Sequence, residues 1–218
     1  KKEKRLTSRI HAAQTVGKAL HLLPPVWIQA SAIGFYGDRK DTVVDESFPK
    51  GTGFLAGVCE KWEAPCREAS LQGIRSVVLR FGIVLGPGGG ILEKLTPLFR
   101  WGFGARLGSG EQWMSWIALE DLIALIEFSL TQNSMQGIFN AVSPNPVTNA
   151  HFTNTLGKTL SRPTYFSAPA WALRLIFGAE KANTLLLSCS PARELSPKQG
   201  TSVTCSAKAQ PLQKLLLS

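Results

Sequence analysis

The alternation of strand-like and helix-like segments is the feature that most constrains the fold of this chain. Residues 26–31 form a short apolar run after Pro24 and Pro25, and residues 74–81 form a second run. Residues 54–71, which lie between them, carry apolar side chains at helical spacing. Continuous apolar runs are typical of strands buried on both faces of a parallel sheet. The alternation therefore predicts an α/β fold built on a parallel sheet.

Further elements follow from the same patterns along the rest of the chain. A third strand is expected at residues 137–142, and residues 37–53 and 102–110 are expected to be a loop and a turn-rich ribbon because of their glycine and polar content. Other helices are expected at residues 4–22, 91–101, 119–130, near 149–160 and near 168–179.

Charge and length limit the partners of the chain. The net charge is +9 over 218 residues, but residues 1–10 carry a net +4 and residues 188–218 a net +3. A nucleic-acid-binding protein more often spreads its basic residues along one folded face, so solvated charged ends are the preferred interpretation and no nucleic-acid partner is expected. No apolar run reaches the ~18 residues of a spanning helix, so no membrane partner is expected either.

The cysteines and histidines predict no metal site. Four cysteines fit no zinc-binding spacing, and the three histidines are scattered along the sequence. Reduced thiols are the default for such a chain, which favours a cytoplasmic location. The cysteines are Cys59, Cys66, Cys189 and Cys205.

Several stretches, taken together, resemble a known family. They are Ser-Ala-Ile-Gly-Phe-Tyr-Gly-Asp at 31–38, Phe-Leu-Ala-Gly-Val-Cys-Glu-Lys-Trp-Glu at 54–63, Leu-Arg-Phe-Gly-Ile-Val-Leu-Gly-Pro at 79–87, and the segments 108–121 and 140–144. As a set they resemble the epimerase-like NAD(P)-binding proteins of the extended short-chain dehydrogenase/reductase superfamily. The most similar subfamily has a small C-terminal extension and is sometimes labelled nucleoside-diphosphate-sugar epimerase or cell-division-inhibitor-like. The similarity covers about residues 5–185.

The resemblance implies a partial Rossmann-like, doubly wound parallel sheet with a smaller substrate lobe. Residues 1–164 would form the C-terminal part of the NAD(P)-binding domain with the inserted lobe. Residues 165–218 would form the small extension, and its end has the composition of a disordered segment.

The family holds the cofactor pyrophosphate with a glycine-rich turn after its first strand, and no such turn opens this sequence. We therefore interpret the chain as N-terminally truncated. The intact protein would bind NADP or NAD. These 218 residues alone would bind either cofactor only weakly or not at all. Residues 86–90 are a weak substitute for the missing turn, because the resemblance places them at the crossover into the substrate lobe.

Short-chain dehydrogenases transfer protons with a Tyr-x-x-x-Lys pair on one helix face, where the lysine lowers the pKa of the tyrosine. The matching positions here are Phe54 and Val58, and neither side chain can transfer a proton. Ser31 is the candidate assisting hydroxyl, although Ala32 lies closer to the usual position. Tyr36 is a candidate substitute acid/base, and its alternative is a turn residue that packs below the substrate lobe.

The resemblance also implies which residues meet the ligands. Ser31, Phe81, Gly82 and Ile83 would contact the cofactor, with Gly82 allowing close approach to the flat ring. The predicted substrate-binding residues are Gly108, Ser109, Gln112 and Trp116.

Other side chains have a functional and a structural interpretation. An aromatic group around the turn-rich ribbon would line a pocket or, as we prefer, form the core of the smaller lobe; it comprises Trp101, Phe103, Trp113 and Trp116. For Arg80 a structural ion pair is preferred, and for Asp121 a helix cap.

Two functions remain open from the sequence. The first is an NAD(P)-dependent epimerase or oxidoreductase acting on an unknown, nucleotide-sugar-like small molecule. The second is a non-catalytic NAD(P)-binding regulatory protein with a protein partner, as in a cell-division-type role. Whether the chain forms a homodimer is also left open. The missing Tyr-Lys pair favours the second function, and the glycine and aromatic pattern favours the first.

Overall fold

Three parallel strands form the main sheet, in a computed structural model that describes residues 24–169 and residues 8, 11, 12, 14 and 15. The strands are β1 (Val26–Ala32), β2 (Arg75–Phe81) and β7 (Gly137–Ala141), in the order β1-β2-β7. Their register places Ser31 beside Arg80 and Arg80 beside Asn140. Because residues in one register row point to the same face of a sheet, these three polar side chains share one face.

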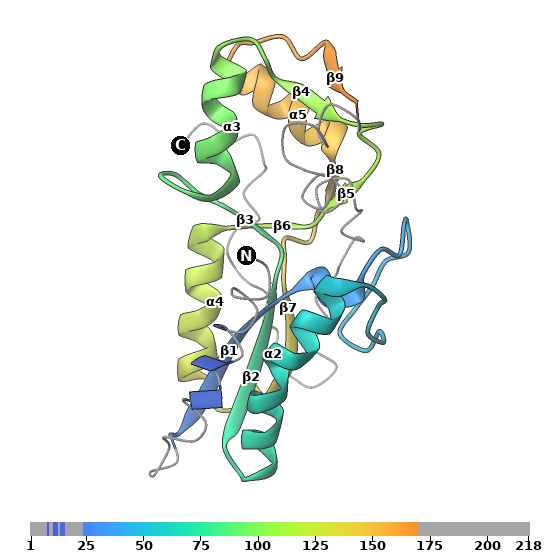
Figure 1. Cartoon of the computed structure of the whole chain (residues 1–218). Coiled ribbons are helices and arrows are strands. Elements are labelled where there is room, and N and C mark those ends of the chain that lie inside the picture. Colours follow the sequence, from blue (N-terminus) through green and yellow to red (C-terminus); the bar gives the residue numbers. More distant parts are fainter. Residues whose placement is uncertain (1–7, 9–10, 13, 16–23, 170–218) are drawn as a thin grey trace.

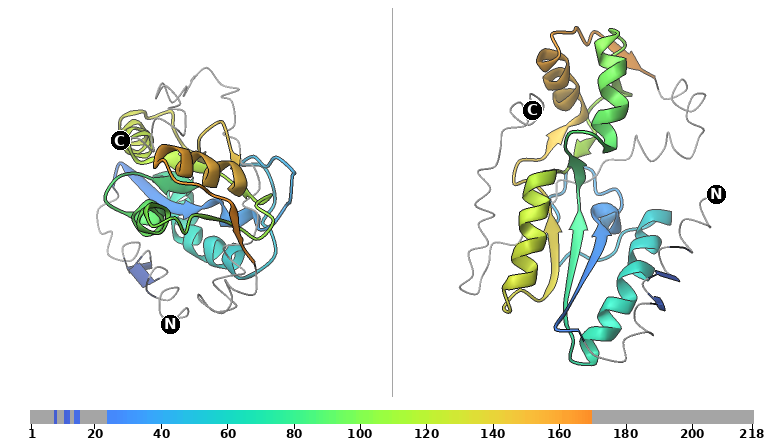
Figure 2. Two further views of the ribbon diagram at one scale, coloured as in Figure 1. Left: turned by 90° about the horizontal axis from the view of Figure 1, so that it is seen from above. Right: turned by 90° about the vertical axis from the view of Figure 1, so that its left-hand side faces the viewer.

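Helices cover both faces of this sheet. Helix α2 (Phe54–Leu71) lies on one face and α4 (Leu119–Thr131) on the other (Figures 1 and 2). Val77 and Leu79 of β2 pack in the cluster that includes the buried residues of α4, whereas Val78 packs with Cys66 of α2. Successive residues of β2 therefore enter different cores, which explains why the whole strand is apolar instead of alternating. We call the sheet, α2 and α4 the lower lobe.

A smaller upper lobe follows β2 (Figure 1). Its hydrophobic core lies between α3 (Gly90–Arg100), α5 (Asn149–Thr159) and short strand pairs, and includes Leu85, Phe99, Met114, Trp116, Phe152 and Leu156. The pairs are β3 (Ile83–Leu85) with β6 (Trp116–Ala118), β4 (Ala105–Leu107) with β9 (Phe166–Ala168), and β5 (Trp113–Met114) with β8 (Val147–Thr148). The first two pairs are parallel and the third is antiparallel.

The expected α/β fold with a parallel sheet is confirmed, and α2 has the predicted bounds. The helix expected near 168–179 is wrong at its start, because Ala168 ends strand β9, which is held by pairing with β4. The rest of that helix, most of the helix expected at 4–22, and the tail with Cys189 and Cys205 lie outside the described residues. The boundary predicted at 164/165 stays a prediction. Among the described helices, none has the length and apolar character needed to cross a membrane.

Candidate functional site

The two predicted catalytic hydroxyls lie at the carboxyl end of the sheet. Ser31 is near the end of β1, and Tyr36 ends the short 3-10 helix η1 (Ile33–Tyr36) that follows it. Both side chains are enclosed by protein, with exposed fractions of 2% for Ser31 and 1% for Tyr36. Neither hydroxyl therefore lies on the surface that a ligand would reach in this conformation.

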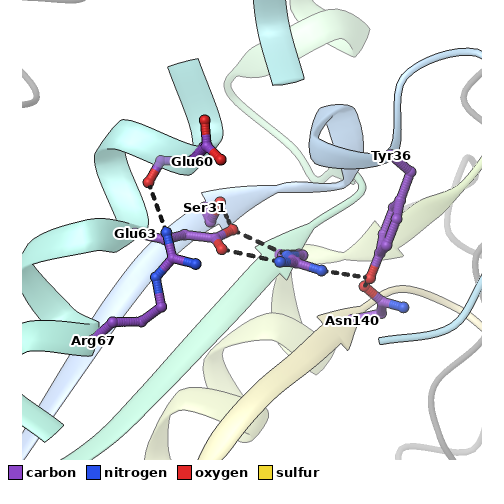
Figure 3. Close-up of polar contacts among 7 residues, drawn as sticks. Ser31, Tyr36, Glu60, Glu63, Arg67 and Asn140 are labelled. Carbon is purple, nitrogen blue, oxygen red and sulfur yellow. Dashed lines mark hydrogen bonds and ion pairs between the residues drawn. The ribbon is translucent and has the colours of Figure 1, made fainter. Parts of the chain in front are cut away.

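A buried ion pair connects these hydroxyls (Figure 3). Arg80 on β2 donates from Nε to Oε1 of Glu63 at 3.0 Å and from Nη2 to Oε2 at 2.9 Å. Ser31 Oγ donates to the same Oε1 at 2.6 Å. Arg80 Nη1 donates to the Tyr36 hydroxyl at 2.9 Å, and that hydroxyl donates to Oδ1 of Asn140 at 2.7 Å. Five residues from β1, η1, α2, β2 and β7 thus form one polar network, which we call the buried network.

The chemistry of the partners sets the direction of every bond in the buried network. A guanidinium only donates hydrogen bonds and a carboxylate only accepts them. The proton of Ser31 is therefore committed to Glu63. The Tyr36 hydroxyl accepts from Arg80 and commits its own proton to Asn140, because the amide oxygen Oδ1 can only accept. This arrangement satisfies the buried charges, but it leaves neither hydroxyl free to exchange a proton with a substrate.

Burial raises the pKa of the Tyr36 phenol, and the nearby Arg80 charge only partly opposes this effect. A tyrosine acid/base needs the opposite shift, towards neutrality. Burial also works to lower the pKa of Arg80, but the hydrogen bonds and charge of Glu63 outweigh it, so the pKa of the guanidinium is raised. Arg80 further lies 3.5 Å from the centroid of the Phe35 ring, a cation–π contact. Arg80 is thus part of a structural ion pair with Glu63, which is the interpretation preferred from the sequence.

Phe54 and Val58, at the positions of the absent Tyr-Lys pair, lie in the first turns of α2. Phe54 is 49% exposed and Val58 only 8% exposed. Both side chains are hydrocarbon, so these two positions offer apolar surface and no proton donor or acceptor. Cys59, the next residue, is buried; its hydrogen-bond contact with Ser31 is outweighed by burial, which raises the pKa of the thiol.

The predicted cofactor contacts Phe81, Gly82 and Ile83 lie where the chain leaves the sheet. Residues 76–80 are buried, whereas residues 81–84 are partly exposed. A Cβ on Gly82 would lie 2.7 Å from the carbonyl oxygen of Ser115. The glycine is therefore required by packing between the lobes, a reason different from the expected close approach of a ring. The partly exposed residues 81–83 are still compatible with the nicotinamide end of a dinucleotide at this edge, where doubly wound sheets bind ligands.

Three of the predicted substrate residues, Gly108, Ser109 and Gln112, lie in one ribbon of the upper lobe, whereas Trp116 lies in strand β6. Gln112 Nε2 donates to the Leu107 carbonyl at 3.0 Å, and Ser109 Oγ accepts from the Glu111 amide at 3.3 Å. Gly108 donates its amide to the Ala168 carbonyl at 2.9 Å. Trp116 is buried in the lobe core and donates from Nε1 to the Asn145 carbonyl at 3.0 Å. Trp116 thus lies in the core of the smaller lobe, as its structural interpretation predicts.

The expected aromatic core holds for Trp116 only. Trp113 is partly exposed and lies outside the core cluster, and two further residues are mostly exposed. Trp101 is 73% exposed and Phe103 is 70% exposed, because they lie at and just after the end of α3 instead of between the lobe's helices. Asp121 does not cap α4 with its side chain; Ala118 is the N-cap residue, and Asp121 lies in the first turn, where burial raises the pKa of its carboxyl.

Glu63 and Asn140 were missed as members of the buried network. Glu63 follows Cys59 by four residues and precedes Cys66 by three, so helical spacing already placed it on the buried face of α2. A carboxylate on a buried face requires a partner, and Arg80 in a buried strand requires one too. Asn140 carried no comparable signal, since its role depends on the register between β2 and β7.

The described residues contain no cluster of histidine, cysteine or acidic side chains suited to a metal ion. Residues 86–90 do connect a strand to a helix, β3 to α3. However, β3 pairs with β6 outside the main sheet, and a Cβ on Gly86 would meet the Leu119 side chain at 2.7 Å. These observations agree with a crossover into the upper lobe.

Comparison with known proteins places this geometry among epimerase-like proteins. No protein-family model matches the chain. An epimerase family protein of Mycobacterium bovis is 48% identical over 160 residues, which are 73% of this chain and 53% of that protein. The chain spans about half the length of the bacterial relatives that it matches in this way.

Solved structures give the same result. The crystal structure of human epimerase family protein SDR39U1 (isoform 2) with NADPH matches with a TM-score of 0.85 and 29% identity, covering 97% of this chain and 72% of that chain. A nucleoside-diphosphate sugar epimerase from Corynebacterium glutamicum matches with a TM-score of 0.63 and 34% identity, covering 84% of this chain and 35% of that chain.

Proposed function

Because this chain belongs to the epimerase-like proteins of the extended short-chain dehydrogenase/reductase superfamily, we propose that it supplies the nicotinamide-facing and substrate-facing side of an NAD(P)-binding site. The observation that carries this proposal is the partial exposure of residues 81–83 at the carboxyl edge of the sheet. The similarity to a human relative crystallised with NADPH supports the choice of ligand. Whether NAD or NADP is preferred depends on the adenosine end of the site, which residues 81–83 do not contact.

In this proposal each group of residues has a distinct role. The backbone of Phe81, Gly82 and Ile83 lies against the nicotinamide ring, and the apolar Phe54 excludes water beside it. The cofactor supplies hydride exchange when bound. Ser31 acts through Glu63 by holding the end of β1 against α2, so it is a positioning residue in this scheme.

We further propose that Tyr36 does not transfer the proton. Its hydroxyl is committed within the buried network, and burial raises its pKa.

The substrate class proposed for a catalytic form is a nucleotide-linked sugar, supported by the name of the Corynebacterium relative. The second candidate, a non-catalytic NAD(P)-binding regulatory protein with a protein partner, is favoured by the hydrocarbon side chains of Phe54 and Val58. The cytoplasmic location and the homodimer stay predictions.

Cofactor turnover by the full-length protein separates the two candidates. Binding of NADPH and NADH is measured by calorimetry, and turnover is measured with a panel of carbonyl and nucleotide-sugar substrates. Turnover of any panel member supports the enzyme, whereas tight binding without turnover supports the regulatory protein. Absence of binding to both cofactors would contradict the proposed function in either form.

The role of Tyr36 is tested in the same assay with Tyr36→Phe. If the phenol is structural, any turnover by the variant should stay within a few-fold of the parent once folding is confirmed by thermal denaturation. Loss of a general acid/base should instead cost about 100- to 10,000-fold. Tyr165→Phe is the matched control, because Tyr165 is the other tyrosine of the chain and its side chain is exposed.

A further inference from the structure

The loop at residues 37–53 connects η1 to α2, and its body is firmly attached to the lower lobe. Val44 is fully buried in a cluster with Tyr36 and Val142. Glu46 accepts a hydrogen bond from the backbone amide of Asn140 on β7 at 2.6 Å. The Gly51 amide donates to the Phe35 carbonyl at 2.9 Å. The body of the loop therefore moves with the sheet and the buried network.

The tip of the same loop, residues 38–43, has a different environment. Residues 38 and 40–43 are exposed, and Lys40 has a φ of 53°, which is unfavourable for a residue with a side chain. Asp41 accepts a hydrogen bond from Trp113 Nε1 at 2.8 Å. Trp113 begins β5, so this bond connects the lower lobe to the upper lobe. Figure 1 shows the loop, in blue, projecting beside η1 towards the level of β5.

We propose that the tip at residues 38–43 is a strap between the two lobes, latched by the Asp41–Trp113 hydrogen bond, which opens while the body of the loop stays in place. Segments with little buried surface and exposed hydrogen bonds open locally at low free-energy cost. Residues 40–43 fit this description, and the buried Val44 marks one end of the mobile part. Arg39 marks the other end, because its guanidinium donates to the carbonyls of Tyr36, Pro49 and Lys50 at 3.1–3.4 Å. Opening of residues 40–43 requires the loss of the exposed Asp41–Trp113 hydrogen bond, and cleavage at Arg39 also requires release of its bonds to the loop body. Neither hydrophobic core is disrupted.

The position of the latch gives the strap a functional consequence. Trp113 directly follows Gln112, and the Gln112 carbonyl accepts the Asn149 amide at 2.9 Å, so β5 is held against the first residue of α5. An open tip removes the Asp41 contact of the Trp113 indole, next in sequence to the predicted substrate residue Gln112 in the ribbon. The strap thereby regulates access to this ribbon, and this consequence rests on the proposed function.

Limited proteolysis tests the latch without any ligand. Arg39 and Lys40 place two trypsin sites within the tip. Trp113→Phe keeps an aromatic ring, removes the Nε1 donor and leaves the sequence at both cleavage sites unchanged. Because cleavage follows the population of the open form when opening is fast, we expect the initial rate at Arg39 and Lys40 to rise about three- to fivefold, the effect of losing one exposed hydrogen bond of typical net strength.

Trp101→Phe is the matched control, because Trp101 is an exposed tryptophan of the same lobe. Cleavage of Trp113→Phe at the rate of the parent, or an equal rise in Trp101→Phe, would overturn the proposal. Thermal denaturation confirms that both variants fold.

Hydrogen exchange gives a second readout that does not depend on protease specificity. Asp41→Ala should speed exchange of the amides at 38–43 about as much as Trp113→Phe does, and the double variant should be no faster than either single variant. Additive effects of the two substitutions would show that the residues act separately. Neither measurement involves a cofactor, so its failure is distinguishable from a failure to bind NAD(P).

Discussion

The two charged members of the buried network, Arg80 and Glu63, neutralise each other. Arg80 is 1% exposed and Glu63 is fully buried, so each charge would be strongly destabilising alone. The register of the sheet aligns Ser31, Arg80 and Asn140 in one row, and α2 brings Glu63 to it. At the scale of single residues, the polar side chains at the end of the sheet therefore act as one structural unit, and they are not available to react with a substrate.

Glu63→Gln tests this unit. The substitution preserves shape and one acceptor but leaves the Arg80 charge uncompensated, so the free energy of unfolding should fall by about 3–5 kcal/mol. The measurement is the denaturant midpoint in chemical unfolding.

Glu60→Gln is the control on the same helix. It removes only the exposed ion pair of Glu60 with Lys50, which spans 2.7 Å, and exposed pairs contribute little to stability. Equal effects of the two substitutions would contradict the structural role of Glu63.

The aromatic and charged residues show where single-residue inference succeeds. Arg80 in a run of buried residues required a carboxylate, and the ion pair follows from the cost of burying a charge. Trp101 and Phe103 were assigned to a core only because they are large and apolar. Their exposure shows that apolar character does not determine burial for a residue at the end of an element.

At the scale of elements, long segments were predictable and short ones were not. The α2 helix of 18 residues and the seven-residue strand β2 carry clear periodicity or a continuous apolar run. The strands β3, β5, β6, β8 and β9 contain two or three residues each. Such segments are too short to show a period, so their pairing is decided by the elements around them.

The end of α4 is held by an arginine from a neighbouring strand. Arg75 at the start of β2 donates to the carbonyls of Ser129, Leu130, Gln132 and Met135 at 2.9–3.2 Å. The carbonyls of Ser129 and Leu130 are among those that lack helical partners at a C-terminus, whereas those of Gln132 and Met135 belong to the turn after the helix. One side chain therefore fixes α4 and the turn that leads to β7.

We expect Arg75→Met to lower the free energy of unfolding by about 1.5–3 kcal/mol, because it keeps the aliphatic stem and removes the charged donors. Amide exchange should also accelerate at residues 129–136. Arg67→Met is the control, since Arg67 makes one exposed bond to the Glu60 carbonyl. An unchanged unfolding midpoint for Arg75→Met would show that water replaces the arginine at no cost.

At the scale of the whole molecule, the carboxyl edge of the sheet is where we propose one side of a dinucleotide site. The family's pyrophosphate contacts come from backbone N–H groups of a glycine-rich turn at a helix N-terminus. Residues 86–90 connect β3 to α3 outside the main sheet and do not provide this arrangement.

The 218-residue chain should therefore bind NADPH weakly or not at all. Isothermal titration calorimetry measures this directly, with the human relative crystallised with NADPH as the positive control. Micromolar binding by the 218 residues would contradict the expectation and would indicate a phosphate site elsewhere in the chain.

The sequence by itself determined the α/β class, the bounds of α2, the parallel strands and the absence of the Tyr-Lys pair at Phe54 and Val58. These properties depend on local periodicity and on side-chain chemistry, which can be read from short stretches of consecutive residues. Only the tertiary structure decided that the hydroxyls of Ser31 and Tyr36 are committed to partners, and that Asp41 reaches Trp113. These contacts join residues far apart in the chain, so they depend on strand register and on how the two lobes pack.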